Sequence, residues 1–478
     1  MGGSITLGTG TLARVRSSWL LTVVVLTLTI PIDAGQNLSF GSRNAKPVPE
    51  WLNRLTIYEI WLKAFSKEGT LRGATPRLHY ISELGASAIY LGPIAKRSAT
   101  PHASPYNIAD YNVIDAEYGT DQDLRDFVAE AHKLHLKVLL DIVYYHAAPD
   151  STMMKDSGSF LKTPGGEIAG GFWKQPMPDF KNSRVRRYLA DSLVHWVRDF
   201  DVDGFRCDVG GGVPVAFWEQ ARRELDKQKP DVILLSESDR PDDQLNAFDI
   251  NYNFEYYLAL QSVMLKGEPA STIRRQWEEM RRTMPQGARL LHFDDNHDWR
   301  RPVLEFGEEG SMVCSVLNFA LDGIPLIYNG QEIGDASLTH WTSSAPIHWL
   351  DDPRQSVNGD HRKQIFAAYK KLFQMRADHA EFTSGDLVWV NNSEPDSVLS
   401  FLRIKGTGEI LVILNMSNRK LRVTIDLPVM DYYVVDELLK GGQTWFPLYS
   451  GRVSTELGGF GYLVGKKIPA SEYEKLPR

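Results

Sequence analysis

Eight short apolar runs alternate with helical segments along most of this 478-residue chain, and this alternation constrains the fold more than any other feature. The runs are Leu55–Trp61, Ser87–Leu91, Lys137–Val143, Gly204–Asp208, Val232–Glu237, Ala247–Ile250, Arg289–Phe293 and Ile324–Tyr328. Strands that alternate with helices predict a parallel sheet, because a helical crossover returns the chain in the same direction. Eight such units predict a closed α/β barrel of the (β/α)8, or TIM, type.

Three regions are expected along the chain. Residues 35–386 would form the barrel, and residues 144–183 a short subdomain inserted after the third strand, since a connection this long is usually functional. From residue 387 to 478 the pattern changes to short apolar runs separated by turns, without a helix. This predicts a C-terminal antiparallel β-sandwich.

The first 34 residues have the layout of a secretory signal peptide. Arg14 and Arg16 precede the apolar run Trp19–Ile32, and small residues follow it at Ala34. The run is short for a membrane span, although an uncleaved anchor is the alternative. We therefore expect a secreted or periplasmic protein with no membrane partner after signal removal.

Composition excludes some classes of function. The net charge of -7 argues against nucleic acid as a partner, because proteins that bind phosphate backbones are usually basic. The chain has two cysteines, Cys207 and Cys314. Without closely spaced His or Cys partners they do not predict a metal site. Both are expected to be buried free thiols, with a disulfide as the less favoured alternative.

Three carboxylates follow three of the expected strands: Asp208, Glu237 and Asp298. Strand ends in a parallel barrel share one face, and that face carries the chemistry of such enzymes. Acids gathered there repel one another, so folding alone does not explain them. Cleavage of a sugar acetal does, because it needs one ionised and one protonated carboxyl group.

Further polar residues accompany these acids. Arg206 lies two positions before Asp208, on the same face of the strand. A guanidinium there would lower the pKa of the carboxyl and keep it ionised, although a purely structural ion pair is the alternative. Asp141 and His146 follow the third strand, and His297 precedes Asp298. The histidines could donate hydrogen bonds to sugar hydroxyls.

Together these motifs resemble the α-amylase family of glycoside hydrolases, from about Leu55 to Gly334. The resemblance implies a carbohydrate partner, an α-glucan or oligosaccharide, and retaining cleavage of α-glucosidic bonds. It implies that Asp208 is the nucleophile, Glu237 the general acid and base, and Asp298 the residue that holds the ring hydroxyls. Substrate contacts are implied for the matching residues Tyr106, Asp141, His146, Arg206, His297 and Arg301.

Some positions depart from the family pattern. Tyr145 stands where many members have a calcium-binding Asn, and Gly212 where α-amylases often have a His. We therefore expect no cofactor and no catalytic metal, and these departures argue against a structural calcium. Val209 resembles members that act on α-1,6 bonds or cyclic dextrins, whereas Asn107 replaces an Asp of exo-acting glucosidases. Linkage preference stays open.

Two alternatives share the same barrel. In the first, the sugar is transferred to another sugar in place of water, which gives a transglycosylase or isomerase. In the second, the barrel binds without catalysis, as in transporter-associated members of the family. The presence of all three acids favours an enzyme over the second alternative.

Overall fold

The computed structural model describes residues 40–337, 345–350, 359–427, 433–446 and 451–468. The expected signal peptide, residues 1–34, lies outside them. No helix in this described part of the chain is long and apolar enough to cross a membrane.

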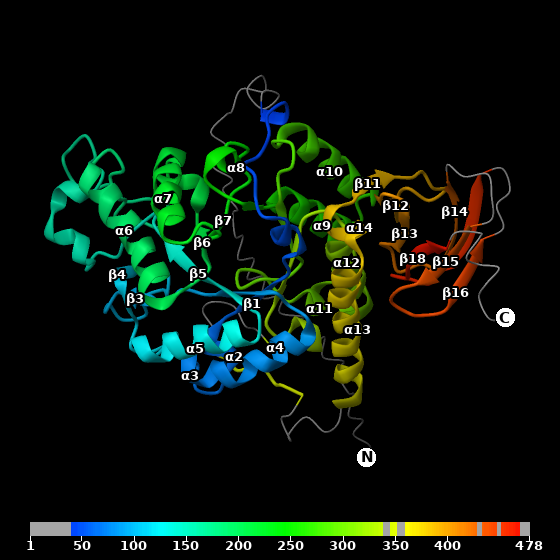
Figure 1. Cartoon of the computed structure of the whole chain (residues 1–478), viewed down its shortest axis with the longest axis horizontal. Coiled ribbons are helices and arrows are strands. Elements are labelled where there is room, and N and C mark those ends of the chain that lie inside the picture. The colour runs from blue at the N-terminus through cyan, green and yellow to red at the C-terminus, as the bar shows by residue number, and fades with distance from the viewer. Residues whose placement is uncertain (1–39, 338–344, 351–358, 428–432, 447–450, 469–478) are drawn as a thin grey trace, which may run out of the picture.

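Eight parallel strands close into a barrel at the centre of the molecule (Figure 1). Around the barrel the order is β1 (Ile57–Ile60), β10 (Ile324–Tyr328), β9 (Leu290–His292), β8 (Ile250–Tyr252), β7 (Ile233–Ser236), β6 (Gly204–Asp208), β5 (Lys137–Val143) and β2 (Ala88–Leu91). The predicted barrel is confirmed. β8 begins later than expected because Ala247 caps a short helix, with its N–H bonded to the Asp243 carbonyl.

Alternating side chains of the strands build two separate cores. One set fills the barrel interior and includes Ile57, Tyr90 and Leu235. The other set packs outward against the helices and includes Tyr58 and Cys207. This alternation sends Cys207 to the helix layer while its neighbours on β6 face inward. Cys207 and Cys314 are both buried and free, as expected.

Helices lie outside the strands (Figure 1). The α-helices of the described residues are α2 (Leu62–Phe65), α3 (Leu71–Ala74), α4 (Leu78–Leu84), α5 (Asp121–Lys133), α6 (Ser183–Phe200), α7 (Val215–Gln228), α8 (Asp243–Asn246), α9 (Phe254–Lys266), α10 (Ser271–Thr283), α11 (Pro302–Glu305), α12 (Gly307–Ala320), α13 (Gly359–Asp378) and α14 (Ala380–Ser384). The 3-10 helix η1 (Glu50–Arg54) precedes β1, and its Leu52 joins the core of the barrel interior. α5 starts with a capping box, in which Thr120 and Asp123 satisfy each other's backbone N–H groups.

Two excursions leave the barrel after its second and third strands. The expected one follows β5 and contains η3 (Thr152–Lys155), η4 (Ser157–Ser159) and a ribbon of isolated antiparallel bridges. The other is a hairpin of β3 (Ala95–Arg97) and β4 (Ile108–Ile114), which the sequence did not predict. β3 is only three residues long and includes Lys96 and Arg97, so it lacks an apolar strand signal.

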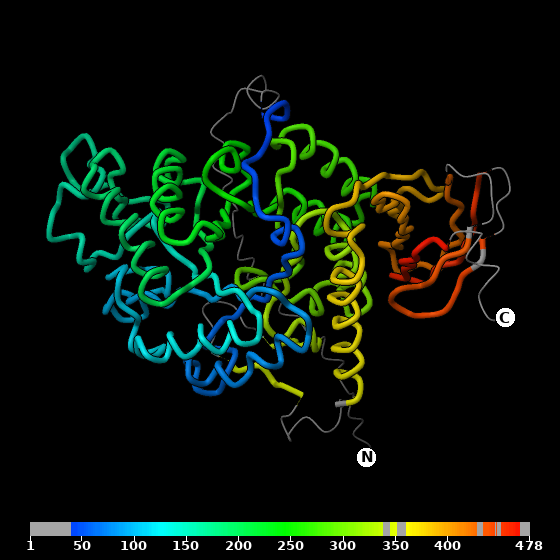
Figure 2. Tube along the Cα trace, viewed as in Figure 1, coloured from blue at the N-terminus to red at the C-terminus, as the bar shows by residue number. Residues whose placement is uncertain are grey.

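The C-terminal part is an antiparallel sheet domain beside the barrel, coloured orange to red in Figure 2. Its larger sheet has the order β11 (Asp386–Trp389), β12 (Val398–Lys405), β13 (Gly408–Asn415), β18 (Tyr462–Ile468), β15 (Tyr433–Glu437) and β16 (Gln443–Phe446). β14 (Leu421–Asp426) pairs with β17 (Arg452–Leu457). Phe401 packs toward the barrel helices, and Leu402 toward the β14–β17 pair. β16 and β17 were not predicted.

Candidate active site

A single buried guanidinium organises the carboxylates at the end of β6. Nη1 of Arg206 lies 3.0 Å from Oδ1 of Asp141 and 2.8 Å from Oδ1 of Asp208. Nη2 of Arg206 lies 2.6 Å from Oε1 of Glu237. Asp208 and Glu237 are therefore held at the two ends of one planar fork. The structure brings together residues that the sequence separates by 29 to 96 positions, because β5, β6 and β7 are neighbours in the barrel.

The backbone after Asp208 is bent toward Glu237. Val209 has a φ of 43°, a left-handed conformation that is unusual for a β-branched residue. In this conformation its N–H donates to Oε2 of Glu237 at 2.7 Å. Such outliers persist only where the surroundings enforce them. Here the strained peptide fixes the Glu237 carboxyl next to the end of β6.

Burial raises the pKa of Asp208, and the neighbouring Glu237 carboxylate raises it further. Arg206 lowers this pKa, as expected from the sequence, but it does not outweigh the other two effects. The prediction that Arg206 keeps the pKa of Asp208 low is therefore wrong. Burial also raises the pKa of Glu237, against the effect of Arg206. Each carboxyl therefore disfavours ionisation of the other.

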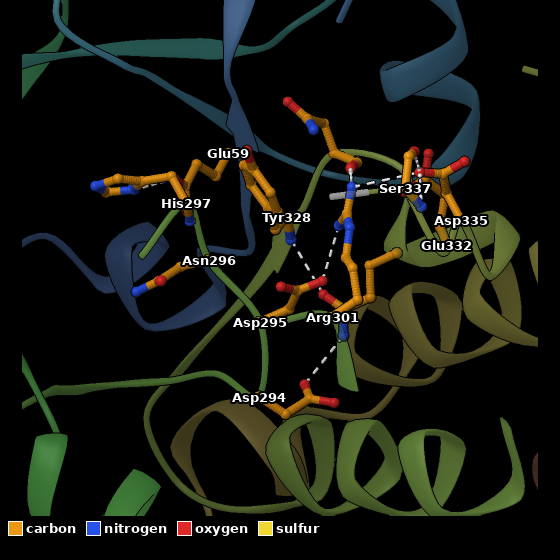
Figure 3. A network of polar contacts seen from close by, with 12 residues as sticks. Glu59, Asp294, Asp295, Asn296, His297, Arg301, Tyr328, Glu332, Asp335 and Ser337 are labelled. Carbon is orange, nitrogen blue, oxygen red and sulfur yellow. Dashed lines mark hydrogen bonds and ion pairs between the residues drawn. The ribbon is translucent and has the colours of Figure 1, made fainter. Parts of the chain in front are cut away.

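A further buried carboxylate, Glu59 on β1, anchors His297 (Figure 3). Oε1 of Glu59 lies 2.5 Å from Nδ1 of His297 and accepts the His297 backbone N–H at 3.3 Å. Burial lowers the pKa of His297, but Asp298 and Glu59 outweigh it and raise the pKa to about 9. Nε2 of His297 faces Tyr106 Oη at 2.6 Å and Asp298 Oδ2 at 3.4 Å.

Stacked rings form one wall of the site. The rings of Trp61 and His297 are 5.6 Å apart and nearly parallel, and those of Tyr106 and His297 are 5.7 Å apart. The Tyr106 hydroxyl donates to Asp141 at 3.1 Å, which links this wall to the Arg206 cluster. The Asp298 side chain is 36% exposed, whereas Arg206 is fully buried, so Asp298 lies on the open side.

His146 lies behind Tyr106. Its Nε2 is 3.1 Å from the Tyr106 carbonyl oxygen, and its Nδ1 is buried without a partner among the described residues. Burial lowers the pKa of His146 to about 4, so the imidazole is neutral at physiological pH. The acceptor at Nε2 means that this nitrogen carries the proton.

Arg301 belongs to a neighbouring buried network (Figure 3). It donates to Asp295 at 2.8 Å and to the Asn329 carbonyl at 2.6 Å, and it lies 3.8 Å from Asp335. Within the described residues, its hydrogen bonds and ion pairs do not reach the three acids. The substrate contact expected for Arg301 stays a prediction.

An aromatic ring fills the space beside Gly212. A Cβ atom on Gly212 would lie 2.6 Å and 2.7 Å from two ring carbons of Tyr145. The aromatic ring therefore occupies the space beside residue 212 with carbon atoms, whereas calcium requires oxygen ligands. Over the described ranges of the chain, no group of three or more His, Cys, Asp or Glu residues could hold a metal ion.

Three of the site residues that the sequence reasoning missed share one property. Glu59, Tyr90 and Tyr252 lie within strands and face the barrel interior; Tyr90 donates to Asp141 at 2.8 Å, and the Arg206 guanidinium lies over the Tyr252 ring at 5.6 Å. Of these residues, Glu59 could have been found from the sequence, because it is an acid in the middle of an otherwise apolar strand. A buried acid there requires a partner.

A closed (β/α)8 barrel with clustered carboxylates at the carboxyl ends of its strands is an arrangement typical of barrel-type glycosidases. The α-amylase catalytic domain family matches residues 38–165 and 168–370. The chain belongs to this family.

Known relatives agree with this assignment. A maltogenic α-amylase from Thermotoga neapolitana has a similar structure, with a TM-score of 0.79, 28% identity, and coverage of 87% of this chain and 99% of that one. The α-amylase MalA from Haloarcula japonica is 27% identical over a matched region that covers 81% of this chain and 59% of the relative. A maltogenic α-amylase from Bacillus acidopullulyticus is 27% identical over 83% of this chain and 76% of its own length.

Proposed function

We propose that this chain hydrolyses α-glucosidic bonds in α-glucans or maltooligosaccharides with retention of the anomeric configuration. The observation that carries the proposal is the bridge from Asp208 through Arg206 to Glu237. One guanidinium that contacts both carboxyls keeps them near one another, and retaining glycosidases need carboxyls roughly 5 Å apart. The named activities of the α-amylase and maltogenic relatives support the substrate class.

The reaction would proceed in two steps. In the first, the Asp208 carboxylate attacks the anomeric carbon while the bond to the leaving oxygen breaks, and Glu237 gives its proton to that oxygen. In the second, water attacks the anomeric carbon, Glu237 takes a proton from the water, and the ester to Asp208 breaks. The mechanism requires that Glu237 carries a proton and Asp208 is ionised when the reaction starts.

The other residues would hold the sugar. Asp298 lies on the open side and would bind ring hydroxyls, and Nε2 of the buried His297 lies 3.4 Å behind it. Tyr106 would stack on the sugar that is cleaved, since it belongs to the ring wall and is only partly buried. Asp141 and His146 would support this wall through the Tyr106 hydroxyl and carbonyl.

Product analysis tests the proposal. The purified chain would be incubated with maltodextrins, pullulan, cyclodextrins, isomaltose, trehalose and sucrose. Proton NMR would report the anomeric configuration of the first product that is released. Release of α-anomeric maltooligosaccharides or glucose is expected. A first product of β configuration, or no turnover of any glucan, would overturn the proposal. Added acceptor sugars would reveal transfer to sugar in place of water.

We also propose export from the cytoplasm. Support comes from the charged residues Arg14 and Arg16 ahead of the apolar run Trp19–Ile32. One relative, from Bacillus subtilis and 26% identical over 429 residues, is named an intracellular maltogenic amylase. Fractionation of cells that produce the full chain, with N-terminal sequencing of the mature protein, would test export. Recovery of uncleaved chain in the cytoplasm would contradict it.

A further inference from the structure

The excursion after β5 carries two exposed aromatic rings at its tip. Phe172 and Trp173 are 58% and 51% exposed, and their rings meet edge to face at 5.3 Å. The other large hydrophobic side chains that are exposed in the described part of the chain are aliphatic. A single exposed apolar residue needs no explanation, whereas two adjacent aromatic rings form a small surface that a ligand can cover.

The tip has a defined backbone. Gly170 and Pro176 form an antiparallel bridge, and the Lys174 N–H donates to the Gly171 carbonyl at 2.8 Å across the turn. The Ala147 N–H donates to the Pro176 carbonyl at 2.9 Å, which ties the ribbon to the chain just beyond β5. The backbone bonds therefore present the rings at a fixed place relative to the end of the third barrel strand.

That place adjoins the candidate active site. The Trp173 ring centre lies 5.4 Å from that of His146 and 5.9 Å from that of Tyr145. His146 in turn contacts the carbonyl of Tyr106, the partly buried ring of the aromatic wall. Only one buried imidazole therefore separates the exposed Trp173 from the wall that faces the three acids.

We propose that Trp173, flanked by Phe172, is a platform for a sugar ring of the same substrate chain, beside the sugar that is cleaved. This rests on the proposed function and adds a binding position that favours longer substrates. The apolar face of a pyranose matches the face of an indole, and the indole N–H can bond a sugar hydroxyl. Continuity with the Tyr106 wall favours this occupant over a protein partner.

Binding and turnover together test the platform. Calorimetry in a Glu237→Gln background would compare the Kd for maltoheptaose with and without Trp173→Ala. Kinetics with Glu237 intact would compare kcat/KM for maltoheptaose with kcat/KM for maltotriose. We expect Trp173→Ala to weaken maltoheptaose binding about tenfold and to lower the ratio of the two kcat/KM values to a similar extent. Trp173→Tyr, which keeps an aromatic face, should recover most of both.

Leu265→Ala is the matched control, since Leu265 is 47% exposed and lies on α9. It should change neither the Kd nor the ratio. A Kd and ratio unchanged by Trp173→Ala in a protein that turns over both substrates would overturn the platform but not the proposed function. If the protein with Trp173 and Glu237 intact turned over neither substrate while Trp173→Ala still weakened maltoheptaose binding, the proposed function would be overturned and the platform would stand.

Discussion

Oε1 of Glu59 lies 2.5 Å from Nδ1 of His297, and both side chains are almost completely buried. Glu59 also accepts the backbone N–H of His297, so it fixes the position as well as the charge of the imidazole. Nε2 of His297 in turn contacts the Tyr106 hydroxyl and the Asp298 carboxylate, so the orientation of the ring also positions these two groups. A residue that touches no expected substrate atom thus positions one that does.

Glu59→Gln should move the alkaline limb of the pH–rate profile toward lower pH. The pKa of His297 is raised to about 9 by Asp298 and Glu59 against burial and Arg206, so the imidazolium persists below that pH and is lost as pH rises through it. Removal of one carboxylate lowers this pKa, by about one unit. The profile of kcat/KM against pH measures the shift.

Glu332→Gln is the matched control for this prediction. Glu332 is also buried, but it accepts hydrogen bonds from Tyr58 and Tyr80. Its replacement should leave the alkaline limb in place. If folded Glu59→Gln kept the alkaline limb of the wild-type profile, this would contradict the role of Glu59 in raising the pKa of His297.

Arg206→Met should destabilise the fold by about 3–5 kcal/mol, because it leaves buried carboxylates without their cation. Arg206 contacts Asp141, Asp208 and Glu237 while fully buried. Urea unfolding at neutral pH measures the loss of stability. The loss of stability should be smaller in acid, where the carboxyls are protonated.

Arg206→Lys is the matched control, because it keeps the charge but not the planar fork, and its stability should lie between those of wild type and Arg206→Met. Wild-type stability of Arg206→Met would show that the bridge is not structural.

The barrel and its acids could be predicted because their signals are local. Asp208, Glu237 and Asp298 each follow an apolar run, and the topology brings strand ends to one face. The pKa of Asp208 could not be predicted, because it depends on how deeply the carboxyl is buried and on Glu237 at the end of the neighbouring strand. The position of Arg301 depends on partners that the chain folds around it, such as Asp295.

Other elements gave weak signals. The hairpin strand β3 is polar, and the C-terminal strand β16 (Gln443–Phe446) is only four residues long. Neither has an alternating apolar pattern long enough to distinguish a strand from a loop.

Chelation should leave the melting temperature unchanged. Tyr145 fills the space beside Gly212 with ring carbons, which are not ligands for calcium. Calorimetric scans with excess EDTA, with added calcium and with neither should coincide. A drop in melting temperature on chelation that calcium reverses would contradict this account of the segment.

Gly212→Ala should destabilise the protein by about 1–3 kcal/mol, the usual cost of overpacking. The new Cβ would lie within 2.6 Å of the Tyr145 ring, which must move. Gly458→Ala is the control, since a Cβ there meets nothing within 4 Å. Chemical unfolding of both variants gives the comparison. If both variants had the same free energy of unfolding, the Tyr145 ring would be able to move away from residue 212 without loss of stability.

Mass spectrometry of a trapped intermediate tests the nucleophile most directly. The Glu237→Gln variant slows the water step, so a 5-fluoro-α-glucosyl fluoride, whose fluoride leaves without acid help, should accumulate as a covalent adduct. Peptide mapping should place one glucosyl unit on Asp208, and Asp208→Asn should abolish the label. A label on another residue, or an unlabelled enzyme that releases product with inverted configuration, would contradict the account.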